Sequence, residues 1–255
     1  MRLQVLGCSG GIGPGARTTS FLLDGDILID AGTGLCDLGW DALRGIRHIF
    51  LTHSHMDHVF GIPLLADALF SELDEPLTVH ALPQTIEAIG DHIFNWSLWP
   101  DFRQLPEPRC SVLRFAPQEP GEVRAIGERS VTLAEVRHAV PAAGFMVADA
   151  DGARFCFSGD TGENDTLWPL LNRQERLDLL VIECAFPDEL AALARSAGHY
   201  TPTSLVADLG RLELDTEVAI THIKPGSEER IMEQLHEAAP DRHFHQLRAG
   251  EVFTL

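Results

Sequence analysis

The chain has 255 residues, enough for one large domain with a substantial buried core. It holds 38 acidic and 19 basic residues, and this net charge of −19 disfavours large RNA or DNA partners, which are bound through basic patches. No apolar run approaches the roughly 20 residues of a membrane-spanning helix. The segment before Cys8 is too short for a secretory signal, so we expect a cytoplasmic protein without a membrane partner. The five cysteines are scattered and odd in number, which favours buried thiols over a disulfide framework.

The first part of the chain is predicted to consist of strands joined by tight turns. Residues 3–6 form an opening strand, and a glycine-rich loop follows at 7–15. This loop matches no nucleotide-binding fingerprint, so both a plain connection and a phosphate-binding loop stay open. Residues 21–29 form a hairpin around Asp24-Gly25, a pair typical of tight turns, and the hairpin ends at Asp30.

The next stretch combines helical and extended patterns. Apolar spacing predicts a helix over 57–73 that bends or breaks near Pro63. A strand is expected at 77–81 and a short helix at 84–92.

Residues 94–127 are predicted to form an ordered but irregular insertion. Five prolines in this stretch are too many for regular structure. Four aromatic side chains could pack on the core, form a dimer surface or line a pocket, and core packing is the default. They are Phe94, Trp96, Trp99 and Phe102.

The second half repeats the pattern of the first. Residues 145–157 form another hairpin around Asp151-Gly152, and it ends at Asp160 in a loop with Thr-Gly, as the first ends at Asp30. The repetition indicates a weak internal duplication and a two-layered sheet core wrapped by helices. The remaining expected elements are strands at 179–183, 217–221 and 251–254, and helices at 188–197, from Thr201-Pro202 onward, and at 228–238.

The strongest functional signal is the stretch Thr52-His53-Ser54-His55-Met56-Asp57-His58, which follows an apolar run. Imidazole and carboxylate are the ligands that zinc and similar divalent ions prefer. Where a strand ends in a loop, His53 and His55 can project to one side, while Asp57 and His58 turn onto the next helix and face a second point. This arrangement suits two neighbouring metals better than one.

The pattern His-x-His-x-Asp-His resembles the signature of the metallo-β-lactamase superfamily. The resemblance implies an α/β fold, a four-layer αβ/βα sandwich that forms a single domain over residues 1–255, with the metals at one edge between the sheets. It also implies two divalent ions, with zinc as the default and manganese or iron as fitting alternatives. The matching ligands are His53, His55 and His138 for one metal, Asp57, His58 and His222 for the other, and Asp160 as the bridge.

Two later stretches resemble the Glu and His motifs of the phosphodiesterase branch of this superfamily. They are Glu183-Cys184-Ala185-Phe186 and Gly198-His199-Tyr200-Thr201-Pro202. The resemblance implies that His199 donates a proton to the leaving oxygen and that Glu183 orients it, with Asp57 and Asp160 as further catalytic residues. General-acid help of this kind is worth about 10²- to 10⁴-fold. A histidine that only caps a helix is the alternative for His199.

Together with the glycine-rich loop, residues 92–102 and Thr221-His222-Ile223-Lys224-Pro225 make the chain resemble bacterial class II cyclic-nucleotide phosphodiesterases most closely. The resemblance implies that 3′,5′-cyclic nucleotides, cAMP or cGMP, are opened to 5′-monophosphates by metal-bound hydroxide. The expected partner is therefore a small anionic phosphodiester. Candidate substrate contacts are Lys224, the only lysine, together with Trp96 and Ser9.

Four other functions stay open. A phosphodiesterase for cyclic ribose phosphates would share the fold, and so would a tRNA 3′-processing nuclease, although we find no arm for grasping tRNA. Thioesterases of the glyoxalase II type also carry a bridging aspartate. A non-catalytic binding protein is disfavoured because no ligand position is missing. A homodimer stays open as well.

Overall fold

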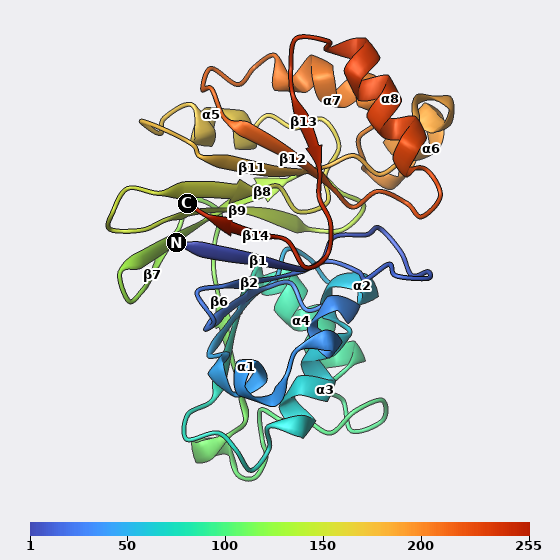
Figure 1. Ribbon diagram of the computed structural model, residues 1–255. Helices are drawn as coiled ribbons and strands as arrows, with labels where there is room; N and C mark the ends of the chain where they lie inside the picture. The colour runs from blue at the N-terminus through green and yellow to red at the C-terminus, as the bar shows by residue number, and fades with distance from the viewer.

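Two seven-stranded sheets form the centre of the computed structural model, which describes residues 1–255 (Figure 1). From edge to edge, the first sheet contains β14 (Val252–Thr254), β1 (Arg2–Gly7), β2 (Ser20–Leu23), β3 (Ile27–Ile29), β4 (His48–Phe50), β5 (Leu77–Ala81) and β6 (Leu113–Pro117). The second contains β7 (Val123–Ile126), β8 (Arg129–Val136), β9 (Ala142–Ala148), β10 (Arg154–Phe157), β11 (Leu179–Glu183), β12 (Glu217–Thr221) and β13 (Phe244–Gln246).

The two sheets share one pairing pattern. In each, the first four strands pair antiparallel, as β14-β1-β2-β3 and as β7-β8-β9-β10. In each, the last four strands pair parallel, as β3-β4-β5-β6 and as β10-β11-β12-β13. The duplication that the two hairpins predict is therefore present in the topology of the whole fold.

Alternating side chains divide the core into layers. Phe21 and Leu23 of β2 face the space between the sheets, whereas Leu22 faces the helices on the outer side. In β10, Phe155 and Phe157 likewise point inward, and Cys156 points to the opposite helical layer. Both faces of each sheet are thus covered, which explains why these strands are apolar at nearly every position.

Helices cover the outer faces of the sheets, and the expected four-layer sandwich is confirmed (Figure 1). Helices of the first half lie below the sheets in this view: α1 (Trp40–Gly45), α2 (Met56–Val59), α3 (Gly61–Ala68) and α4 (Pro83–His92). Those of the second half lie above: α5 (Leu167–Leu171), α6 (Ala191–Ala197), α7 (Pro202–Leu209) and α8 (Glu228–Ala238). Short 3₁₀ turns occupy Thr33–Asp37, Pro108–Cys110 and Asp188–Leu190. None of the helices combines the length and the apolar character needed to cross a membrane.

The helix predicted over 57–73 is two helices. Its break falls at Phe60, between α2 and α3, and Pro63 lies inside the first turn of α3, where its missing N–H costs nothing. The chain leaves the helix after Ala68, earlier than predicted.

The stretch 94–127 is irregular only in its first part, and the expectation of irregular backbone throughout is wrong. Strands β6 and β7 lie within it and form one edge of each sheet. Phe94 and Phe102 are buried in the core with Trp99 packed against them, which is the default packing role. Trp96 is 58% exposed.

Candidate metal centre

The histidine-rich loop occupies the carboxyl end of β4, at the edge where the parallel strands of both sheets end. His53 and His55 lie on the extended segment before α2, and Asp57 and His58 lie in the first turn of α2. Ligand sites of α/β sheets lie at this end of the strands.

All seven predicted ligands converge. Their donor atoms form overlapping groups in which every atom lies within 4.8 Å of the others: His53 with His55 and His138; His53 with His58 and Asp160; Asp57 with His58 and His222. Asp160 Oδ2 lies 3.8 Å from His53 Nε2, 3.4 Å from His58 Nε2 and 3.1 Å from His222 Nε2. Asp160 therefore stands between the group of His53, His55 and His138 and the group of Asp57, His58 and His222, as a bridging ligand would.

The unpaired donor atoms fit divalent cations. His138 Nδ1 lies 3.0 Å from the carbonyl oxygen of Gly198, so Nδ1 carries the proton and donates this hydrogen bond. Nε2 is then unprotonated, and its lone pair is available to a metal. That Nε2 faces His55 Nδ1 at 3.2 Å. In addition, His53 Nε2 and Asp160 Oδ1 are buried without any hydrogen-bond partner. Lone pairs this close and this buried are expected where a cation holds them together.

Asp30, which the sequence analysis did not assign to the site, supports one ligand from behind. Its Oδ2 lies 2.7 Å from His58 Nδ1, and its Oδ1 accepts hydrogen bonds from the N–H and the hydroxyl of Thr52. A carboxylate behind a ligating histidine fixes the ring and makes its other nitrogen a better donor to metal. The signal was present in the sequence, because Asp30 ends the first hairpin as Asp160 ends the second.

The electrostatics favour ligand-competent protonation states at Asp160 and His138 but not at His58. Burial would lower the pKa of His58, but the charges of Asp160 and Asp30 raise it well above its ordinary value. Burial opposes ionisation of Asp160, but His222 and His58 outweigh it and hold the pKa of this carboxyl well below its usual range. Burial lowers the pKa of His138 to about 4. An ionised carboxylate and a neutral imidazole are the forms that bind metal.

The glycine-rich loop supports His222. Residue His222 has a φ of 59°, a left-handed conformation that non-glycine residues rarely adopt. Its N–H donates to the carbonyl of Cys8, and a Cβ on Gly10 would lie 2.4 Å from its carbonyl oxygen. Gly10 is thus required for close packing of two loops, which is the structural role of this segment.

Glu183 and His199 form a pair beside the cluster. His199 Nδ1 lies 2.7 Å from Glu183 Oε1, and the buried carboxylate also accepts the N–H groups of Thr161, Ala185 and Tyr200. Burial alone would lower the pKa of His199, but the charge and hydrogen bond of Glu183 raise it above its ordinary value. The ring of His199 lies 4.8 Å from that of His138, between centroids. The helix cap that follows is made by Thr201 with Ser204, not by His199.

The three candidate substrate contacts have different surroundings. Lys224 Nζ donates to the carbonyl of Gly10 at 2.7 Å. Ser9 lines a separate cavity of about 230 Å³, together with Arg17 and Arg248. Trp96 lines neither this cavity nor the one beside His199, which is larger.

The chain is similar in sequence to known hydrolases. A family profile described as "Beta-lactamase superfamily domain" matches residues 26–245. A probable 3′,5′-cyclic-nucleotide phosphodiesterase of Yersinia pestis is 27% identical over 210 residues, which are 73% of this chain and 60% of that protein. The chain thus spans less than two thirds of this relative's length.

Two further proteins are similar over most of the chain. A ribonuclease Z of Haloarcula marismortui is 25% identical over 272 residues, covering 88% of this chain and 86% of that enzyme. The crystal structure of unliganded yeast PDE1 superimposes with a TM-score of 0.85 at 18% identity, covering 100% of this chain and 99% of that one. At this identity the structural match establishes the shared fold.

Proposed function

Because the chain belongs to the β-lactamase superfamily, we propose that its histidine and aspartate cluster holds two divalent metal ions, by default zinc, and hydrolyses a small phosphodiester. The leading substrate is a 3′,5′-cyclic nucleotide, cAMP or cGMP, opened to the 5′-monophosphate. The observation that carries the proposal is the Glu183–His199 pair, which stands beside a complete set of seven ligands.

The bound metals would draw charge from the phosphate and lower the pKa of water toward 7, which is the chemistry that such ions supply. The protein's own part is to hold that arrangement and to deliver a proton. As the oxygen of water bonds to phosphorus, the bond from phosphorus to the 3′-oxygen breaks. His199 would give its Nε2 proton to this departing oxygen.

Glu183 makes His199 suitable for that role. Because its carboxylate accepts from His199 Nδ1, the proton on this nitrogen is fixed and Nε2 is the nitrogen directed away from the pair. Three backbone N–H groups hold the carboxylate in place. The imidazole is therefore positioned before substrate binds, which is how general-acid groups gain their effect.

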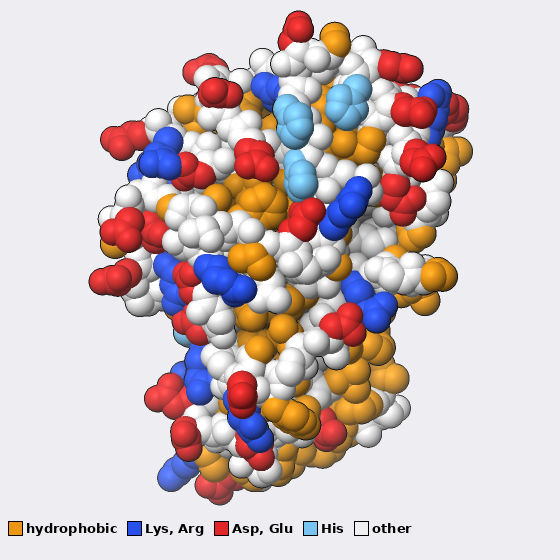
Figure 2. All heavy atoms as spheres, viewed as in Figure 1, with side chains coloured by type: hydrophobic (Ala, Val, Ile, Leu, Met, Phe, Trp, Pro, Cys, Tyr) orange, Lys and Arg blue, Asp and Glu red, His pale blue; other side chains and the backbone are white.

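The ribonuclease Z relatives support a second candidate, cleavage of a 3′-extended RNA. The alignment with the Haloarcula enzyme covers more of that protein than the alignment with the Yersinia phosphodiesterase does. Against it, the chain has a net charge of −19, and lysine and arginine side chains stand singly among acidic ones on the face that Figure 2 shows. A long polyanion binds best where such side chains form a continuous patch.

The test is to incubate the zinc-loaded protein with 3′,5′-cAMP, 3′,5′-cGMP and a 3′-extended tRNA and to separate the products by chromatography. Release of 5′-AMP or 5′-GMP is expected, abolished in His199→Ala but not in His236→Ala, which changes an exposed histidine on α8. Release of 3′-monophosphates would contradict the assigned leaving group. Cleavage of the tRNA alone would select the second candidate.

A further inference from the structure

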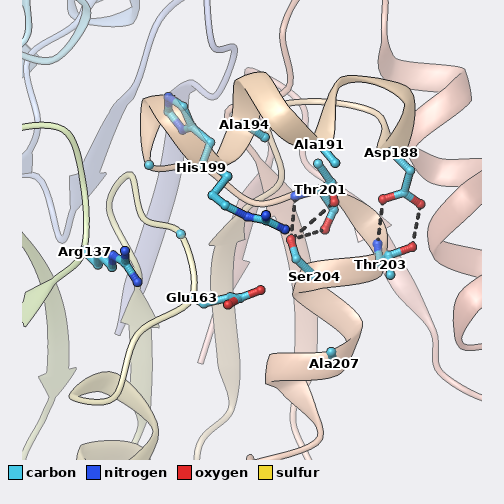
Figure 3. A pocket seen from close by; sticks show the side chains of 13 residues that line it. Arg137, Glu163, Asp188, Ala191, Ala194, His199, Thr201, Thr203, Ser204 and Ala207 are labelled. Carbon is cyan, nitrogen blue, oxygen red and sulfur yellow. Dashed lines mark hydrogen bonds between the residues drawn. The ribbon is translucent and has the colours of Figure 1, made fainter.

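A cavity of about 450 Å³ adjoins the cluster at His199. It is lined by α6, α7, the loop before β9 and the loop after β10. Figure 3 shows His199 and Asp188 at its opposite ends, with Arg137 and Glu163 on these two loops. Cavities of this size bind nucleotide-sized ligands. Its only apolar side chains are alanines, so the His199 imidazole is the only aromatic ring in its lining.

Two guanidinium groups line this cavity without a partner. The side chains of Arg137 and Arg195 make no ion pair and no hydrogen bond, although acidic residues outnumber basic ones two to one in the chain. Elsewhere, Arg103, Arg129 and Arg230 are each paired with carboxylates. The two cavity arginines are thus available to a ligand.

The acidic residues of the cavity form no ion pair with these arginines. Both carboxylate oxygens of Asp188 accept hydrogen bonds, one from the N–H and the other from the hydroxyl of Thr203 (Figure 3). Glu163 is exposed and pairs with no cation. Five N–H donors in a planar fork make arginine the side chain best suited to a phosphate group.

The same segments that carry the arginines position the reacting groups. Arg137 directly precedes His138, and its carbonyl accepts the N–H of Gly162. Arg195 lies in the last turn of α6, and Gly198, which has a φ of 74°, caps the end of this helix. A Cβ on Gly198 would lie 2.9 Å from the Cα of His138, so this turn must approach the metal ligand closely. A ligand in the cavity would therefore touch the wall that holds both His138 and His199.

We propose that this cavity binds a phosphate monoester carried by the leaving-group side of the substrate, with Arg137 and Arg195 as its partners. The inference rests on the proposed function, because it takes His199 as the group that faces the departing 3′-oxygen. It adds to the proposed substrates those phosphodiesters whose leaving nucleoside carries a second phosphate, which a 3′,5′-cyclic nucleotide lacks. A 5′-phosphorylated dinucleotide, pApA, is the simplest such compound: water adds to its phosphodiester, the bond to the 3′-oxygen breaks, and two molecules of 5′-AMP result.

The experiment compares pApA with ApA, which differs only in lacking the 5′-phosphate, on the zinc-loaded protein. A charged hydrogen-bonded contact is worth about tenfold to a hundredfold in kcat/KM, so the wild type should prefer pApA by about that factor. Arg137→Gln and Arg195→Gln should each bring the ratio of the two kcat/KM values to within about threefold of one. Arg173→Gln, which changes an exposed arginine outside the cavity, should leave the ratio unchanged.

A preference for pApA that survives in Arg137→Gln and Arg195→Gln would overturn the inference, and so would equal turnover of the two dinucleotides by the wild type. If neither dinucleotide nor a cyclic nucleotide is hydrolysed, the proposed activity fails, and calorimetric titration then decides about the cavity. Binding of pApA that is at least tenfold tighter than that of ApA, and lost in Arg195→Gln, would support the phosphate site without that activity. Equal affinities would exclude it.

Discussion

The two halves of the molecule have the same strand pattern but contribute differently to the site. In the first half, the loop after β4 carries four of the seven predicted ligands in six residues. The corresponding loop after β11 carries no ligand, and instead Glu183 at the end of that strand holds His199. The second half also supplies the other three predicted ligands, His138, Asp160 and His222, and adds the Glu183–His199 pair.

The aspartates that follow the two hairpins also differ in their contacts. Asp30 follows β3, is fully buried and turns to His58 and Thr52. Asp160, in the loop after β10, turns into the cluster. One copy therefore supports a ligand, and its counterpart is placed as a ligand. The following substitutions test what each half contributes to metal binding and to activity.

The largest effect is expected from Asp160→Ala. Removing the residue placed between both groups should release metal and lower phosphodiesterase activity at least about 1000-fold, beyond the roughly 100-fold that loss of an outer partner costs. Metal per chain, measured by mass spectrometry after dialysis, should fall together with turnover. Asp67→Ala, an exposed position on α3, is the control. Two retained metals with full turnover would show that Asp160 is not a bridging ligand.

Glu183→Gln tests the second half. We expect kcat to fall about 100-fold with metal content unchanged, because the substitution weakens the hold on His199 and Glu183 itself belongs to none of the groups that could hold a metal. If Glu183 acts only through His199, the double variant Glu183→Gln with His199→Gln should be no slower than His199→Gln alone. Additive losses, or loss of metal, would instead give Glu183 a separate structural role.

Asp30→Asn separates support from ligation. Asparagine offers one acceptor oxygen where Asp30 uses two, so contact with either Thr52 or His58 is lost. Metal affinity, measured by competition with a chelator, should weaken about tenfold to a hundredfold while the full complement still binds at saturating metal. A drop to one metal per chain at saturation would mean that the two aspartates are functionally equivalent.

The sequence predicts the parts of this molecule that depend on neighbouring residues. Strands β5, β11 and β12 and helix α8 occupy the predicted ranges, because each is a short apolar or amphipathic run between turn residues. The His-rich loop is contiguous, and so its ligands can be recognised by spacing.

Features that depend on the tertiary arrangement cannot be predicted from neighbouring residues. Strand β6 ends at Pro117 and lies at a sheet edge, where a missing N–H is tolerated, so proline content is a poor guide there. The cavity beside His199 unites Arg137 and Arg195, which are 58 positions apart and have no motif in common. The aromatic ring of Trp96 makes it a candidate substrate contact in the sequence, but only the fold determines that this side chain is exposed to solvent.

The smallest effect is expected at His80, a buried position at which the two sheets carry different side chains. His80, next to last in β5, lies buried in the first sheet, and the next-to-last residue of β12 is Ile220. Its Nε2 lies 3.1 Å from His48 Nδ1, its Nδ1 has no partner, and its ring stacks on Phe50. Burial, aided by His48, lowers the pKa of His80 to about 3.

A histidine whose pKa is lower in the folded than in the unfolded state contributes stability above its unfolded value, near 6.5, and loses it as the pH falls toward 3. Between pH 7.5 and pH 5 the wild type should therefore lose about 1–2 kcal/mol more unfolding free energy than His80→Leu. Urea unfolding at both pH values measures this difference, with His92→Leu, an exposed position, as the control. Because protonation of the cluster histidines occurs in both proteins, it cancels in the comparison. An equal loss in both would mean that the first sheet opens enough to protonate His80 without unfolding, and that the two sheets differ in rigidity as well as in sequence.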